Sequence, residues 1–373
     1  MKKIAPYQLY FPLGLLNALL AVGVWLVQDL QWFDTPAILI HSKLIAGGFI
    51  WSFIVGFLMT AIPRMTGANS ANVFEYLISS TLLVAQTCSA WISNSRIFYS
   101  VQMVLIVFLI IYGGRRILKM TKPLPVFFSH VGLAMILAFL GSYYYFNGNS
   151  FMGLHLYHLG AILLLVFGIG TRFFSFLSGL PSEFENAESN GARLLFHTCG
   201  ISVGSLLFLA GQGYSVAYLG LVVVSIIYLL KIWKVQRPAD RPSALKYAVR
   251  FVAAMIPLTF LMTWLRPTMF ITWFHLLFIG CFGLITLSVA TRVTLAHGSY
   301  PVDFEKQSRA LWFMFIFLVL GMISRVLYGF SFDLWKKSYL HSAATFWILA
   351  VICWGWVFLP KIFKPGPMAK PSC

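Results

Sequence analysis

The sequence predicts an all-α integral membrane protein, a polytopic bundle of about 12 transmembrane helices forming a single domain over residues 1–373. Three observations predict it. Of the 373 residues, 60% are hydrophobic and only 10% are charged, whereas about a quarter of a soluble domain is charged. The apolar residues gather in stretches near the length of about 20 residues that a helix needs to cross a bilayer. The basic residues between those stretches fall almost entirely on one side.

Each predicted span is an apolar run bounded by a short polar linker or by glycine and proline. In chain order the spans cover residues 12–28, 38–61, 73–92, 97–113, 124–146, 151–172, 192–211, 216–233, 247–265, 269–293, 310–330 and 338–359. The five cysteines are isolated and form no CxxC or CxxCH motif, so neither a disulfide framework nor covalent haem attachment is expected.

The distribution of Lys and Arg predicts the orientation. With the N-terminus inside, 21 of these residues fall on the inner side and four on the outer side. Cytoplasmic loops of membrane proteins carry the excess of basic residues, so both termini are expected in the cytoplasm. The net charge of +17 then reflects topology and contact with anionic membrane lipids. It does not indicate nucleic-acid binding.

Histidines open four of the predicted spans near their outer ends. They are His41, His155 with His158, His275 and His341. Imidazole is a common ligand for iron and copper, so several histidines at one depth in a membrane predict a haem or metal site. The alternative for any one of them is a side chain bonded to water or to a backbone carbonyl.

Two further sets of residues accompany these histidines. Met152, His155 and His158 are spaced three apart, which places them on one face of an α-helix and makes them candidate copper ligands. Lys43 and Arg325 are cations in or near the outer third, where they are candidate partners for haem propionates or for an anionic substrate. The alternatives for these cations are snorkelling to the interface, or pairing with Asp333.

The spacing of basic residues also indicates an internal repeat. Arg172 follows His155 by 17 residues, and Arg292 follows His275 by the same distance. Both arginines come directly after a threonine. We therefore expect three repeats of four helices, which the first copy fits only loosely because His41 has no arginine at that offset.

Four stretches together resemble the NnrS family: residues 41–49, 56–67, 170–176 and 275–298. The resemblance implies a haem- and copper-containing protein of the bacterial cytoplasmic membrane that takes part in the response to nitric oxide. The haem is then expected to be non-covalent and b-type. His41 and His275 match family histidines. Lys43 and Leu44 stand where the family motif has a second histidine and a glutamate.

The leading interpretation is therefore a haem-binding membrane protein, with copper as a second candidate cofactor, acting in nitric oxide metabolism or nitrosative-stress defence. The expected small-molecule partner is nitric oxide or a related compound. Two alternatives are a secondary transporter of a small solute and a membrane accessory protein without a metal. The absence of a carboxylate in mid-span weighs against a proton-driven transporter. No residue is predicted to be catalytic, and an enzymatic role is left open.

Overall fold

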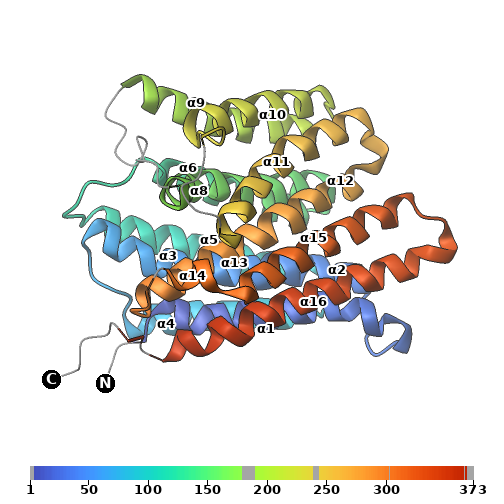
Figure 1. The fold of residues 1–373 in the computed structure, drawn as a ribbon, viewed down its shortest axis with the longest axis horizontal. Coiled ribbons are helices and arrows are strands. Elements are labelled where there is room, and N and C mark those ends of the chain that lie inside the picture. The colour runs from blue at the N-terminus through green and yellow to red at the C-terminus, as the bar shows by residue number, and fades with distance from the viewer. Residues whose placement is uncertain (1–3, 179–189, 238–242, 302, 365, 368–373) are drawn as a thin grey trace.

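The computed structural model describes residues 4–178, 190–237, 243–301, 303–364 and 366–367. Over this part of the chain the ordered elements are all helices, so the predicted all-α class is confirmed. The long helices run side by side along the longest axis of the molecule, and both termini lie at the same end (Figure 1). This agrees with the expectation that both termini lie on one side of the membrane.

The first group of helices extends to residue 117. It consists of α1 (Pro6–Val27), η1 (Gln28–Leu30), α2 (Ala37–Lys43), η2 (Leu44–Ile50), α3 (Trp51–Thr66), α4 (Val73–Ser89) and α5 (Ser95–Ile117). The second group is α6 (Phe128–Phe146), α7 (Ser150–Gly153), η3 (Leu154–Ala161), α8 (Ile162–Ser178), α9 (Asn190–Gly211), α10 (Val216–Ile227) and η4 (Tyr228–Ile232). The third group is α11 (Ala244–Leu265), η5 (Pro267–Met269), α12 (Phe270–Leu277), η6 (Phe278–Gly283), α13 (Leu284–His297), α14 (Phe304–Gln307), α15 (Arg309–Phe330) and α16 (Asp333–Phe363).

Every predicted span coincides with a helix, and ten helices in the described residues are long and apolar enough to cross a membrane. The segments at α4 and at α10 with η4 form shorter helices, so the total of 12 stays a prediction. Four boundaries differ by five or six residues: the starts of α1 and α16, and the ends of α3 at Thr66 and of α8 at Ser178. Helix α1 begins at Pro6, because proline suits the first helical position and the Gln8 side chain accepts a 2.8 Å hydrogen bond from the Ala5 amide. Helix α16 begins at Asp333, so His341 lies well inside it.

One span in each group has the same internal construction. A short α-helix leads into a π-helical segment, which continues as a longer α-helix: α2–η2–α3, α7–η3–α8 and α12–η6–α13. These three are the most buried of the ten candidate spans. A π-helical turn uses i→i+5 hydrogen bonds and is frequently found at functional sites. The shared construction supports the predicted repeat of four helices.

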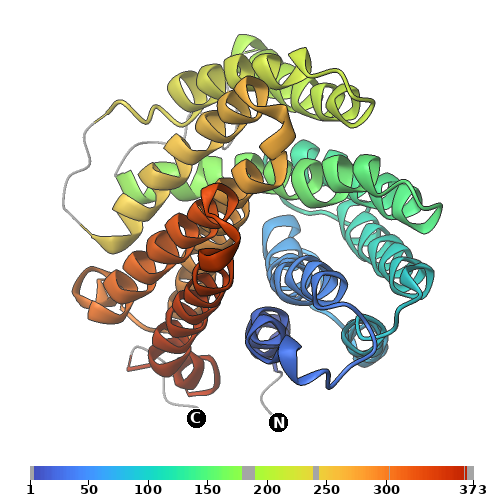
Figure 2. The same ribbon diagram turned by 90° about the vertical axis from the view of Figure 1, so that its right-hand side faces the viewer.

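The three groups close into a ring. Helix α5 packs against α6, α10 packs against α11, and α16 packs against α1. At this last contact the Trp347 indole donates to the Ala18 carbonyl at 3.2 Å, and the Gln8 amide donates to the Ile362 carbonyl at 2.6 Å. Figure 2, viewed along the helices, shows the blue first helix and the red last helices as neighbours. The three π-containing spans therefore form the centre of the ring.

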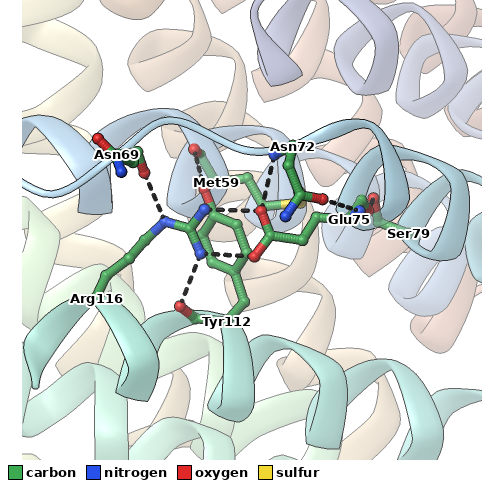
Figure 3. Close-up of polar contacts among 7 residues, drawn as sticks. All are labelled: Met59, Asn69, Asn72, Glu75, Ser79, Tyr112 and Arg116. Atoms are coloured by element: carbon green, nitrogen blue, oxygen red, sulfur yellow. Dashed lines mark hydrogen bonds and ion pairs between the residues drawn. The ribbon is translucent and has the colours of Figure 1, made fainter. Parts of the chain in front are cut away.

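A buried ion pair fixes the inner end of the first group (Figure 3). The Arg116 guanidinium donates to both oxygens of Glu75, at 2.9 and 2.8 Å. Its Nε donates to the Asn69 carbonyl at 3.0 Å. Glu75 also accepts a 2.9 Å hydrogen bond from the Asn72 amide, which completes the N-terminal cap of α4. One carboxylate thus joins α4, α5 and the connection before α4.

An aromatic ring extends this arrangement to a central span. The Arg116 guanidinium lies 3.5 Å from the centre of the Tyr112 ring, a cation–π contact. The Tyr112 hydroxyl donates to the Met59 carbonyl in α3 at 2.8 Å. The position of α3 therefore depends on the same ion pair.

We predict that Glu75→Gln lowers the melting temperature of the purified protein markedly. The change leaves the Arg116 charge buried without its partner, which costs about 3 kcal/mol. The measurement is thermal unfolding in detergent. Asp333→Asn is the matched control, because Asp333 pairs with Lys336 on the surface and such pairs contribute little. Equal melting temperatures for the two variants would contradict the role given to this ion pair.

We also predict that the end of the molecule opposite the termini faces the outside of the membrane. In a background without native cysteines, Ser95→Cys at the start of α5 is expected to react with a membrane-impermeant maleimide in right-side-out vesicles. Ser70→Cys, in the connection between α3 and α4, is expected to react only after permeabilisation. The reverse pattern would overturn the orientation inferred from the basic residues.

Candidate functional site

A cavity of about 610 Å³ lies in the outer half of the ring, between the three central spans and helix α15. Its lining includes one histidine from each central span: His41 of α2, His158 of η3 and His275 of α12. Lys43 and Arg325 also line it. Three of the predicted histidines and both predicted cations are therefore brought together around one space.

His41 and His275 are held in the same protonation state by backbone carbonyls. His41 Nδ1 lies 2.8 Å from the Ala21 carbonyl, and His275 Nδ1 lies 2.6 Å from the Ile271 carbonyl. Because a carbonyl can only accept, each Nδ1 carries a proton, and in the neutral imidazole each Nε2 then keeps its lone pair. Neither Nε2 has a hydrogen-bond partner among the described residues. A ring fixed through Nδ1 with a free Nε2 is the usual arrangement of a metal-ligating histidine.

His158 is the third imidazole of the cavity, but both of its nitrogens have neighbours. Nδ1 lies 3.1 Å from the Tyr145 hydroxyl, and Nε2 lies 3.5 Å from the Ser42 carbonyl. All three rings line the same cavity. His158 therefore lies in the same cavity as His41 and His275, and its ring nitrogens contact Tyr145 of α6 and Ser42 of α2.

The remaining predicted ligands lie outside the cavity lining. His155 Nδ1 donates to the Phe151 carbonyl at 2.8 Å, and its Nε2 accepts from the Tyr218 hydroxyl at 2.6 Å. The Met152 side chain is buried and lies beside α9, where its sulfur faces Gly211. The π-helical turn changes the offset between His155 and His158, so the shared face expected for an α-helix is not formed.

Two cations face the cavity, and no carboxylate among the described residues pairs with either of them. Lys43 is 1% exposed, and its Nζ donates to the Ile92 carbonyl at 2.8 Å. Arg325 lies over the Tyr328 ring at 4.6 Å, and its Nη1 is buried without a hydrogen-bond partner in the described structure. Asp333, an expected partner for Arg325, pairs with Lys336 at 2.7 Å.

The rest of the wall is mainly apolar, and no Asp or Glu is among the described residues that line it. Aromatic side chains contribute much of this wall: Trp25, Tyr99, Tyr145, Phe151, Phe270, Phe278, Tyr328 and Trp347. Burial of a charge in such a wall is costly unless an opposite charge arrives. The cavity therefore suits a largely apolar ligand that carries anionic groups. The ligand would also have an atom to which the imidazole nitrogens can coordinate.

A site for a bare metal ion is not formed in the described residues. No group of three His, Cys, Asp or Glu side chains is placed to hold one. Copper binding by Met152, His155 and His158 stays a prediction, and the hydrogen bonds of His155 give it no support.

Sequence reasoning missed two features of the site. The π-helical segments have no recognised residue pattern, although Gly47 and Gly48 in η2, and Gly280 and Gly283 in η6, mark two of them. Tyr145 was not singled out either. It stacks on Tyr99 with ring centres 4.4 Å apart and positions His158.

Comparison with known proteins agrees with this arrangement. The sequence profile described as "NnrS protein" matches residues 4–365, nearly the whole chain. No curated protein sequence matches. The match covers all three groups of helices and every residue of the cavity, and so confirms the family suggested by the sequence motifs. The chain belongs to the NnrS family.

Proposed function

We propose that this protein binds haem non-covalently in the outer cavity and acts in the nitric oxide response. The observation that carries the proposal is the pair His41 and His275, each with Nδ1 bonded to a carbonyl and Nε2 free. Membership of the NnrS family supports the same function. Three further proposals accompany it: location in the bacterial cytoplasmic membrane, nitric oxide or a related molecule as partner, and copper as a second cofactor.

The residues of the cavity fit haem in three respects. The volume of about 610 Å³ lies within the range of about 300–1,000 Å³ for ligand and cofactor sites. Aromatic and aliphatic walls match an apolar macrocycle. Lys43 and Arg325 match its two propionates, since a charged partner for each is otherwise missing.

The roles of the side chains follow from these contacts. His41 and His275 would hold the haem iron, and the carbonyls of Ala21 and Ile271 hold the two rings in orientation. Arg325 lines the same cavity as both rings. Bound haem would supply an iron that carries electrons when two histidines ligate it, or binds nitric oxide when one position is open.

We predict that replacing histidine by glutamine affects haem binding at His41 and His275 but not at His155. Purified wild type, supplied with haem during expression, is expected to show a Soret band and about one haem per chain. His41→Gln and His275→Gln are expected to lose the band or to shift it, because glutamine is a poor iron ligand. His155→Gln is the matched control and is expected to keep the wild-type spectrum, because His155 faces Tyr218.

Two outcomes would contradict the haem site. One is folded wild-type protein without a Soret band. The other is an equal loss of haem in all three variants when each of them is folded, which would contradict the assignment of His41 and His275 as the ligands. Solute uptake in proteoliposomes that is unchanged in His275→Gln would favour the transporter alternative.

The proposed pairing of Lys43 and Arg325 with the haem propionates gives a separate prediction. Arg325→Gln and Lys43→Gln are each expected to weaken haem binding about tenfold or more, since a hydrogen bond to a charged group contributes about 1.5–3 kcal/mol. Titration of apo-protein with haem measures the effect. Lys336→Gln, a surface control on α16, is expected to bind haem as wild type does. Unchanged affinity in both cavity variants would place the propionates elsewhere.

A further inference from the structure

A second, smaller space continues the cavity toward the inner side of the membrane. Its volume is about 70 Å³, and it lies where α3, α8 and α13 meet on the axis of the ring. Ile50 and Ile162 line both spaces. Since the central spans run inward from their histidines, this space lies directly below the candidate haem cavity.

The walls of this space are almost entirely apolar. Phenylalanine and aliphatic side chains make up nearly all of them, and Thr286 is the one hydroxyl among the described residues of the lining. A buried water needs two to four polar partners. The backbone groups around the space are in helical hydrogen bonds, so one hydroxyl does not hold water there. A space with such a lining favours apolar atoms or molecules over water.

The volume of the space further limits which molecules can occupy it. A water molecule occupies about 30 Å³ of liquid, so about 70 Å³ admits a molecule of two or three heavy atoms. A charged or strongly hydrogen-bonding ligand is excluded by the cost of desolvation without a partner.

We propose that the axis of the ring holds a binding site for a small neutral apolar molecule, such as a diatomic gas, between α3, α8 and α13. The site concentrates such a molecule within the membrane and adjoins the outer cavity at Ile50 and Ile162. It does not depend on haem binding, because no residue that ligates or neutralises haem in the proposal above lines it.

Xenon is the probe for this site. Crystals of the full-length protein, prepared with and without haem, are pressurised with xenon, and anomalous difference density locates it. We expect a peak between α3, α8 and α13 in both preparations. Absence of the peak at saturating pressure, or continuous density for a lipid chain in that place, would overturn the proposal. A peak without any Soret band would retain the gas site and reject the haem site.

Substitutions at Val289 sharpen the test. Val289 lines the small space, so Val289→Phe is expected to fill it and abolish the xenon peak. Val104→Phe is the matched control on the lipid-facing side of α5, where Val104 is 54% exposed, and it is expected to keep the peak. Val289→Ala shortens the side chain and so enlarges the space without crowding α8. It is expected to raise xenon occupancy. A peak of unchanged height in the folded Val289 variants would assign the xenon to another place.

Discussion

The structure depends on one constraint: in a bilayer, backbone amides and carbonyls must be bonded inside the protein. A departure from α-helical hydrogen bonding is tolerated only where protein surrounds it. The three spans in which a π-helical segment lies between two α-helices are accordingly the most buried of the candidate spans, and they form the centre of the ring. Among the outer helices, α10 ends in the π-helical segment η4, in which Tyr228, Leu229 and Ile232 are buried. In each central span the π-helical segment contains the cavity histidine or begins within three residues of it. The π-helical segments therefore lie beside the cavity.

This arrangement explains how polar side chains are kept at membrane depth. Backbone carbonyls hold three of them in place, with Ala21 accepting from His41, Ile271 from His275 and Ile92 from Lys43. The cavity provides the space that their remaining polar atoms face. Its cations lack acidic partners, and in an apolar wall this leaves a strong preference for an anionic ligand. The proposed haem satisfies the free imidazole nitrogens and the unpaired charges together.

The ring also gives the molecule a functional axis. Each group of four helices supplies one central span, so the cavity and the small space beneath it are built by all three groups. Closure by α1 and α16 keeps this axis away from lipid. The Glu75–Arg116 pair holds the inner end of the first group in register with α3 through Tyr112. The cavity and the small space adjoin at Ile50 and Ile162, two apolar side chains that line both of them.

The sequence by itself determined the fold class, the location of the spans and their orientation, because hydrophobic length and the placement of Lys and Arg are local properties. It also placed His41, His275, Lys43 and Arg325 at one depth, and its motifs indicated the family. Only the tertiary structure decided that His158 faces the cavity while His155 faces Tyr218. The reason is geometric: the π-helical turn alters the angular offset on which the three-residue spacing relied. The pairing of Arg325, the closure of the ring and the apolar space on its axis likewise depend on contacts between distant segments, which no local pattern encodes.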